Sequence, residues 1–228
     1  MNTDSKFKLL FSGSRRLAAF TLTELLVVIG IMAIITAVTI PSFQGIGRGT
    51  AMTTAIMELK TTLSLSRQWA ITHRQKVYVV FPDRMINYSG IQSHLYKACK
   101  AYGVFALTNV ASGDVKEGYY VKEWTFLPQG VVFDDDDDRS QTVFTNRIEN
   151  VPFTDGANLR DLYGIIFKPD GTTERYNGYE IFLRDGWAVV DTNSWVPSYG
   201  VNSNGANRGV EVSGLTGGLK LHDYQSGY

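Results

Sequence analysis

The stretch that decides the fold is Phe20–Ile40, FTLTELLVVIGIMAIITAVTI, a run of 21 residues with one charged side chain, Glu24. With a rise of about 1.5 Å per residue, a helix of this length spans roughly 30 Å, the thickness of a bilayer's hydrocarbon core. Lipid offers no partners to backbone polar groups, so a helix is expected in spite of the many Val and Ile residues. The run therefore predicts one membrane-spanning helix.

Basic residues precede this run. Residues 1–19 carry four basic side chains and one acidic one, and the whole chain balances at 22 of each, so the remainder is slightly acidic. Arg15 and Arg16, next to the run, predict a cytoplasmic N-terminus by the positive-inside rule. A cleaved secretory signal needs a shorter apolar region that ends in a small-x-small site, whereas Pro41 and Ser42 follow this run. We expect residues 1–19 to be a leader and the run to be an anchor.

The single carboxylate in the run needs an explanation. At the centre of a bilayer a charged side chain costs about 2–3 kcal/mol unless it is paired. Ala18 and Ala19 are small residues directly before Phe20, and a cut there would create a new α-amine four residues from Glu24. That amine, from this chain or a neighbouring one, is a natural counter-ion for Glu24.

The segment Phe20–Ile29 resembles the N-terminal signature of type IV pilins and of the pseudopilins of type II secretion. The resemblance implies that a prepilin peptidase cuts between Ala19 and Phe20 and N-methylates Phe20. It also implies that Glu24 pairs with the N-terminus of a neighbouring subunit during assembly. Pro41 falls where the family often has a helix-bending proline, whereas Ala19 departs from the glycine that usually precedes the cut.

Beyond the run, a second helical segment is predicted. Gly45, Gly47 and Gly49 predict a flexible joint, because each glycine costs a helix about 1 kcal/mol relative to alanine. From Thr50 on, apolar residues recur at spacings of three, four and seven and predict a stripe that packs on a globular domain: Met52, Ile56, Leu59, Leu63 and Ala70. The expected divisions are residues 1–19 as leader, 20–44 as the transmembrane half of the helix, 45–75 as its amphipathic half, and 76–228 as a head.

The period changes to that of β-strands after His73. Ten short runs of β-branched, aromatic or other apolar residues predict strands: Val77–Phe81, Tyr102–Leu107, Tyr119–Phe126, Val131–Phe133, Tyr163–Phe167, Thr173–Tyr176, Tyr179–Leu183, Trp187–Val190, Val210–Val212 and Gly218–Leu221. Asp170-Gly171 and Asp185-Gly186 predict tight hairpin turns. The fold class is α+β, with a long N-terminal helix on an antiparallel β-sheet head, as the pilin resemblance also implies.

Three segments narrow the resemblance. Residues 63–81, 163–183 and 209–221 look like the helix-to-strand segment, a later hairpin and the last two strands of the H-type minor pseudopilins and their minor-pilin relatives. The implied function is that of a structural subunit of a type II secretion pseudopilus or a type IV pilus. The sequence does not separate these two systems. The implied partners are a prepilin peptidase, other pilin or pseudopilin subunits and the bacterial inner membrane, with the head in the periplasm.

No pattern for catalysis accompanies this signature. There is no Walker loop, nucleophile elbow or HExxH, and Cys99 is the only cysteine, so we expect no enzyme and no cofactor. The alternative cofactor is calcium, because Asp134, Asp136 and Asp138 have the spacing that opens an EF-hand loop. Arg139 and Thr145 stand where that loop needs Gly and Glu, so a solvated loop is the competing interpretation.

The alternative function is a DNA-binding minor pilin. Relatives of this group that take up DNA contact it through basic residues near the C-terminus. The corresponding stretch, Gly217–His222, has one lysine, Lys220, and no arginine. DNA binding usually requires clustered Lys and Arg, so we expect no nucleic-acid partner.

Overall fold

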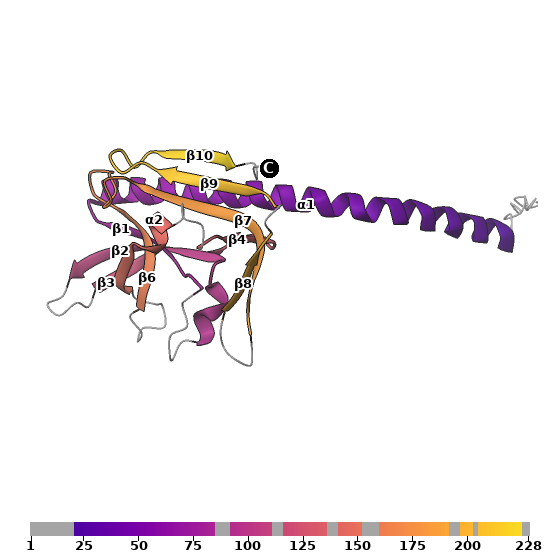
Figure 1. Cartoon of the computed structure of the whole chain (residues 1–228), viewed down its shortest axis with the longest axis horizontal. Helices are drawn as coiled ribbons and strands as arrows, with labels where there is room; N and C mark the ends of the chain where they lie inside the picture. Colours follow the sequence, from indigo (N-terminus) through magenta and orange to yellow (C-terminus); the bar gives the residue numbers. More distant parts are fainter. Residues whose placement is uncertain are drawn as a thin grey trace, which may run out of the picture. The chain divides into compact units, whose positions relative to one another are not determined.

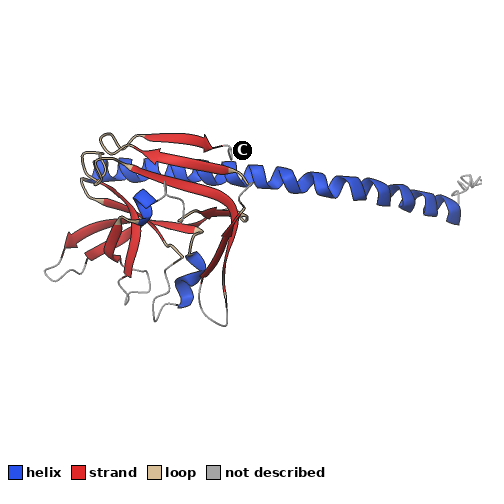
Figure 2. Cartoon of the chain, viewed as in Figure 1, coloured by secondary structure: helices blue, strands red, loops and turns tan. Residues whose placement is uncertain are grey.

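The computed structural model describes residues 21–84, 92–110, 116–135, 141–151, 160–191, 197–202 and 205–224, and within α1 the side chains of residues 38–48 lie outside the description. The chain divides into two compact units, Met1–Gln44 and Gly45–Tyr228. The second unit is called the head below. Its strands and helices are shown in Figures 1 and 2.

One long helix precedes a series of strands. The elements are α1 (Leu22–His73), β1 (Val77–Phe81), the 3-10 helix η1 (Gln92–Lys97), β2 (Ala101–Val110), β3 (Lys116–Phe126), β4 (Val131–Phe133), α2 (Gln141–Phe144), β5 (Arg147–Val151), β6 (Arg160–Phe167), β7 (Tyr179–Val190), β8 (Pro197–Val201), β9 (Asn207–Val212) and β10 (Leu219–Tyr224). The sequence analysis predicted a flexible joint at Gly45, Gly47 and Gly49. This prediction is wrong, because α1 remains helical through all three glycines. Three glycines at about 1 kcal/mol each do not stop a helix of 52 residues.

The strands form two antiparallel sheets. The first has the order β3-β2-β1-β6-β5 and the second has the order β10-β9-β7-β4, with β8 paired to the far end of β7. All of the described pairings are antiparallel. The helices and antiparallel sheets confirm the predicted α+β class.

The main core lies between α1 and the two sheets. The predicted stripe on α1 is confirmed, because Met52, Ile56, Leu59, Leu63 and Ala70 are all buried. They pack with inward-facing side chains of both sheets, among them Phe81, Phe133 and Ile181. The last turns of α1 therefore belong to the head.

A second apolar cluster covers the opposite face of the first sheet. Val77, Val79 and Phe81 of β1 point into the main core, whereas Tyr78 and Val80 point into this second cluster. Leu95 and Ala98, in and just after η1, close it from outside. Because both faces of β1 are covered, all five of its residues are buried, which explains its unbroken apolar sequence VYVVF.

Two sequence predictions about turns and strands are wrong. Asp185-Gly186 is no hairpin turn, because β7 runs through it from Tyr179 to Val190 and changes partner there from β9 to β8. Gly186 suits this crossing because a Cβ would lie 2.5 Å from the carbonyl oxygen of Gly200. Residues 173–176 form no strand either, and only Thr173 makes a bridge, to Phe167.

Two strands were missed by the sequence analysis. β5 (Arg147–Val151) mixes polar and apolar residues, and β8 (Pro197–Val201) lies in a stretch rich in Ser, Asn and Gly. Both lie beside strands that supply their hydrogen bonds, β6 and β7 respectively. Their own side-chain patterns are too weak to indicate strands.

Candidate functional site

The first turn of α1 is closed by a pair of polar residues. Thr21 donates from its N–H and from its hydroxyl to Oε2 of Glu24, both at 2.9 Å. The N–H of Glu24 donates in return to the hydroxyl oxygen of Thr21 at 3.2 Å. This reciprocal arrangement is a capping box, and it places a carboxylate at the positive end of the helix dipole.

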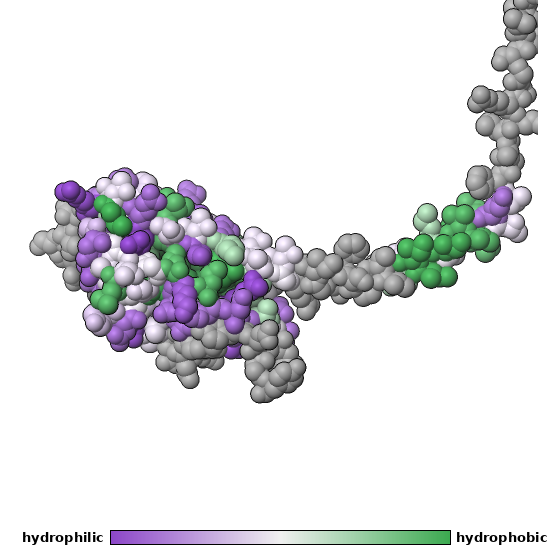
Figure 3. Space-filling model, turned by 90° about the horizontal axis from the view of Figure 1, so that it is seen from above, coloured by the Kyte–Doolittle hydropathy of each residue, from purple (hydrophilic) through white to green (hydrophobic). Residues whose placement is uncertain are grey.

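The residues that follow are apolar and unburied. Every described side chain from Thr21 to Ala37 is exposed. Ten of these are large and apolar and 44–79% exposed: Leu22, Leu25, Leu26, Val27, Val28, Ile29, Ile31, Met32, Ile34 and Ile35. Figure 3 shows a hydrophobic surface along this part of the helix. Exposed apolar surface of this extent marks a site of contact with membrane or protein.

Across the described residues, no helix has the length and hydropathy that a membrane crossing needs. The predicted span, residues 20–40, extends beyond this description at both ends. Phe20 lies outside the described residues, and so do the side chains of residues 38–40.

The structure describes no side chain for three residues to which the sequence assigned a role in processing or bending. Ala19 and Phe20 lie outside the described residues, so the cut between them stays a prediction. Pro41 lies within α1, but its side chain is not described and the two units are not placed relative to each other. The bend at Pro41 also stays a prediction, and Glu24 is the one predicted site residue of this region with described contacts.

The first aspartate of the Asp run is buried in an ion pair. Asp134 is 3% exposed. Its Oδ2 lies 2.9 Å from Nε of Arg184, and its Oδ1 accepts a hydrogen bond of 2.6 Å from the hydroxyl of Tyr199. Burial, and then the hydrogen bond to Asp134, raise the pKa of Tyr199 well above its usual range. The carboxylate therefore ties β8 to the end of β4.

Asp135 is also engaged within the head. Its Oδ2 accepts a hydrogen bond from the backbone N–H of Arg84 at 3.1 Å and lies 3.5 Å from Nε of the same residue. Asp136 and Asp138 lie outside the described residues, so the calcium site stays untested. Within the described ranges no three His, Cys, Asp or Glu side chains cluster as metal ligands do.

Tyr199 and Arg184 were missed by the sequence analysis. Both lie far from the Asp run in sequence, and only the pairing of β7 with β4 and β8 brings them to it. No local pattern could have indicated them. Cys99 is buried, and burial raises the pKa of its thiol, which makes it a poor nucleophile.

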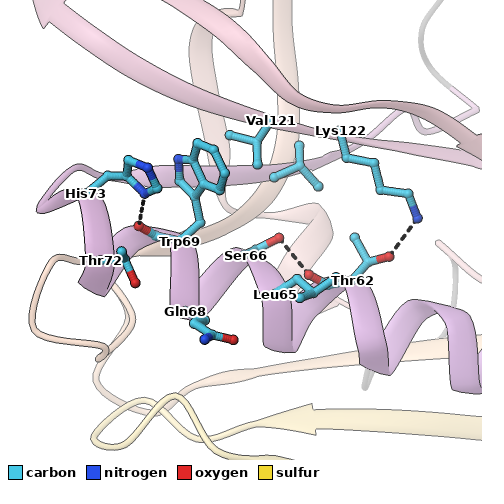
Figure 4. A pocket seen from close by; sticks show the side chains of 10 residues that line it. Thr62, Leu65, Ser66, Gln68, Trp69, Thr72, His73, Val121 and Lys122 are labelled. Atoms are coloured by element: carbon cyan, nitrogen blue, oxygen red, sulfur yellow. Dashed lines mark hydrogen bonds between the residues drawn. The ribbon is translucent and has the colours of Figure 1, made fainter.

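A cavity of about 480 Å³ lies between α1 and strands β2 and β3 (Figure 4). β3 has a bulge at Val121, where the register with β2 shifts, and the consecutive residues Val121 and Lys122 both line the cavity. Lys122 donates to the hydroxyl of Thr62 at 3.0 Å, and Trp69 stacks on His73 with ring centroids 3.9 Å apart. His73 and Lys122 lie at opposite ends in Figure 4, so they form no acid–base pair.

Strands β9 and β10 include the stretch in which DNA binding would need clustered basic side chains. Arg208 pairs with Asp223 at 2.9 Å, and Nε2 of His222 lies 2.8 Å from Glu211. Lys220 lies directly opposite Glu211 in the register of the two strands. The basic side chains of β9 and β10 therefore each lie next to a carboxylate.

No protein-family model matches the sequence. No curated protein matches it significantly either. Among solved structures, the chain is similar to the minor pseudopilin EpsH from the Type 2 Secretion System of Vibrio cholerae. The TM-score is 0.38 and the sequence identity is 12%, over 76% of this chain and 96% of that chain.

Proposed function

We propose that the chain is a prepilin-like structural subunit, a minor pseudopilin or pilin, that assembles into a filament through its N-terminal helix. The observation that carries the proposal is the start of α1. Seventeen consecutive residues, from Thr21 to Ala37, leave their side chains exposed, and the one charge among them is Glu24 at the first turn. An isolated globular protein has no use for such a helix, whereas a subunit that moves from lipid into a helix bundle requires one.

The contacts of Glu24 support a role in pairing. Both described hydrogen bonds to its carboxylate fall on Oε2 and come from Thr21. For Oε1 we propose a second donor, the N-methylated amine of Phe20 on a neighbouring subunit. An ion pair in a low-dielectric helix bundle is far stronger than one in water, so a single pair can select the neighbour and its axial position.

The proposed route follows from the sequence. The chain is inserted into the inner membrane by residues 20–40, with its leader, residues 1–19, in the cytoplasm and its head in the periplasm. A prepilin peptidase then cuts between Ala19 and Phe20 and methylates Phe20. The processed subunit joins other pilins or pseudopilins of a type II secretion pseudopilus or a type IV pilus. This function needs neither catalysis nor a cofactor.

Processing is tested on the N-terminus of the full chain, expressed with and without a prepilin peptidase and analysed by peptide mass spectrometry. We expect the peptide that begins with N-methyl-Phe20 only when the peptidase is present. The variant Ala19→Gly should be cut at least as fast, because it restores the usual residue of the family, and Ala19→Arg should not be cut. An uncut chain that starts at Met1 in the presence of active peptidase would contradict the proposal.

A further inference from the structure

The end of β7 leaves its sheet and forms a two-stranded ribbon with β8. Up to Arg184, β7 pairs with β9, and from Gly186 to Val190 it pairs with β8. The ribbon, residues 186–190 with 197–201, runs along one side of the head (Figure 1). Its two faces have different surroundings.

The inner face of the ribbon packs on the head and the outer face is apolar. Val190 packs on the second apolar cluster. Side chains alternate along a strand, so Trp187 and Val189 point to the opposite face. They are 54% and 52% exposed. Two neighbouring apolar side chains, one of them a tryptophan, thus remain uncovered within the described head.

The indole of Trp187 is held in place by its cross-strand neighbour. Gly200 is the register partner of Trp187 on β8. A Cβ on Gly200 would lie 2.9 Å from three atoms of the indole ring, so the ring lies across the glycine. The backbone of β8 at Gly200 therefore covers part of the exposed indole.

The ribbon begins at the end of the head where the chain enters through α1. Arg208, next to the last β7–β9 pair, donates from Nη1 to the hydroxyl of Thr53, in an early turn of α1 within the head, at 2.8 Å. Figure 1 shows the ribbon on this side of the head. Twelve residues lie between Ile40, where the predicted span ends, and Thr53, and a helix rises only about 20 Å from one to the other.

We infer that Trp187 and Val189 contact the membrane surface before the subunit is assembled. The inference rests on the proposed anchoring, since the short tether keeps the ribbon near the bilayer. Tryptophan favours the interface between lipid and water, where its ring is buried and its N–H stays hydrated. Asp185 and Asp191 flank the pair, so the ribbon suits a zwitterionic lipid surface better than an anionic one.

Lipid contact is measured with an environment-sensitive fluorophore on the full chain in phosphatidylcholine vesicles, with and without nitroxide-labelled lipid. The label is placed on Val189→Cys, with two controls. Val28→Cys reports the anchor, and Leu215→Cys reports an equally exposed apolar site, 60% exposed, in the turn between β9 and β10. Cys99 should remain unlabelled because it is buried and its pKa is raised, and the unmodified chain checks this background.

We expect the nitroxide lipid to quench the labels at positions 28 and 189 several-fold more than the label at 215. Replacing Trp187 by Ser in the Val189→Cys chain should reduce the quenching at 189 and leave that at 28 unchanged. If the label at position 28 is quenched and the label at position 189 is quenched no more than the label at 215, the proposed membrane contact of the ribbon is wrong, although the anchoring by α1 is supported. If the label at position 28 is not quenched, the proposed anchoring by α1 is itself wrong. The emission of the label at position 189 could instead shift to the blue as protein density rises, without quenching by the nitroxide lipid. That result would show that the ribbon contacts a second copy of the chain, and it would overturn the inference.

Discussion

Gly171 joins the turn after β6 to helix α1. Its φ of +82° lies in the left-handed region, which favours glycine. Its carbonyl accepts a hydrogen bond of 3.0 Å from Nε of Arg67 on α1, and a Cβ at this position would lie 2.8 Å from the end of the Ile71 side chain. Next to it, the carboxylate of Asp170 accepts hydrogen bonds from the N–H and hydroxyl of Thr172, at 2.9 and 2.7 Å. The turn after β6 therefore closes against the helix.

The first prediction concerns this turn. Gly171→Ala should lower the free energy of unfolding by about 2 kcal/mol, because it combines backbone strain with contact on Ile71. Gly130→Ala is the matched control, since Gly130 has a φ of +87° but open space around its Cβ position. Urea unfolding followed by tryptophan fluorescence should show the larger loss for Gly171→Ala. Equal losses would mean that the packing on α1 contributes nothing.

At the level of elements, the position of β8 depends on one buried carboxylate. β8 is an edge strand, and its pairing with β7 is reinforced by the bond from Tyr199 to Asp134. Asp134 also pairs with Arg184 from β7. Three segments distant in sequence therefore meet at one side chain, which explains how a stretch rich in Ser, Asn and Gly is held as a strand.

The second prediction tests that tie. Tyr199→Phe removes the hydroxyl and leaves a buried carboxylate with one donor fewer, at a cost of about 2 kcal/mol. Hydrogen exchange should become faster in β8 and remain unchanged in β1. Tyr176→Phe removes a hydroxyl at a residue that is 75% exposed and should have no effect. Indistinguishable variants would show that the bond does not stabilise β8.

The elements that sequence could predict are those with strong local patterns. The stripe on α1 and the strands β1 and β4 follow from periodicity and β-branched residues, and the structure gives the two strands the predicted bounds. Asp185-Gly186 failed because an Asp-Gly pair indicates a turn locally, whereas in the fold it lies where a strand changes partner. Tyr199 and Arg184 could not be predicted, since their contact with Asp134 exists only after the sheet has formed.

At the scale of the whole molecule, the two units differ in what they bury. The head buries two clusters of apolar side chains, which include Tyr102 and Tyr179 with 1% and 2% exposure. The described start of α1 buries none of its side chains. Exposed apolar surface of this extent marks a contact site, and we propose that membrane or neighbouring subunits cover the start of α1.

The third prediction concerns the pH dependence of the head. Burial raises the pKa of Tyr102 and of Tyr179 from 10.0 to about 12. Both rings are neutral below pH 10 in the folded and unfolded chain, so their contribution to stability is complete there. Above pH 10 the unfolded chain releases these protons first, and stability should fall until about pH 12. Circular dichroism of the detergent-solubilised chain measures the alkaline midpoint.

A variant identifies the groups responsible for this alkaline transition. Tyr102→Phe removes one of the groups with a raised pKa, so its loss of stability between pH 10 and 12 should be smaller than in the unmodified chain. Tyr176→Phe should leave the loss unchanged, because Tyr176 is exposed. An equal loss in all three chains would assign the transition to other groups.

The most direct test of the central claim is the incorporation of Glu24 variants into filaments, measured by quantifying the chain in sheared filament fractions and in membranes. Glu24→Gln preserves an acceptor for Thr21 and removes the charge, and Glu123→Gln removes a charge from the exposed surface of the head. The proposed pairing with the Phe20 amine predicts that Glu24→Gln inserts into the membrane and is cleaved, yet is lost from the filament fraction, while Glu123→Gln is retained. Normal incorporation of Glu24→Gln would contradict the account.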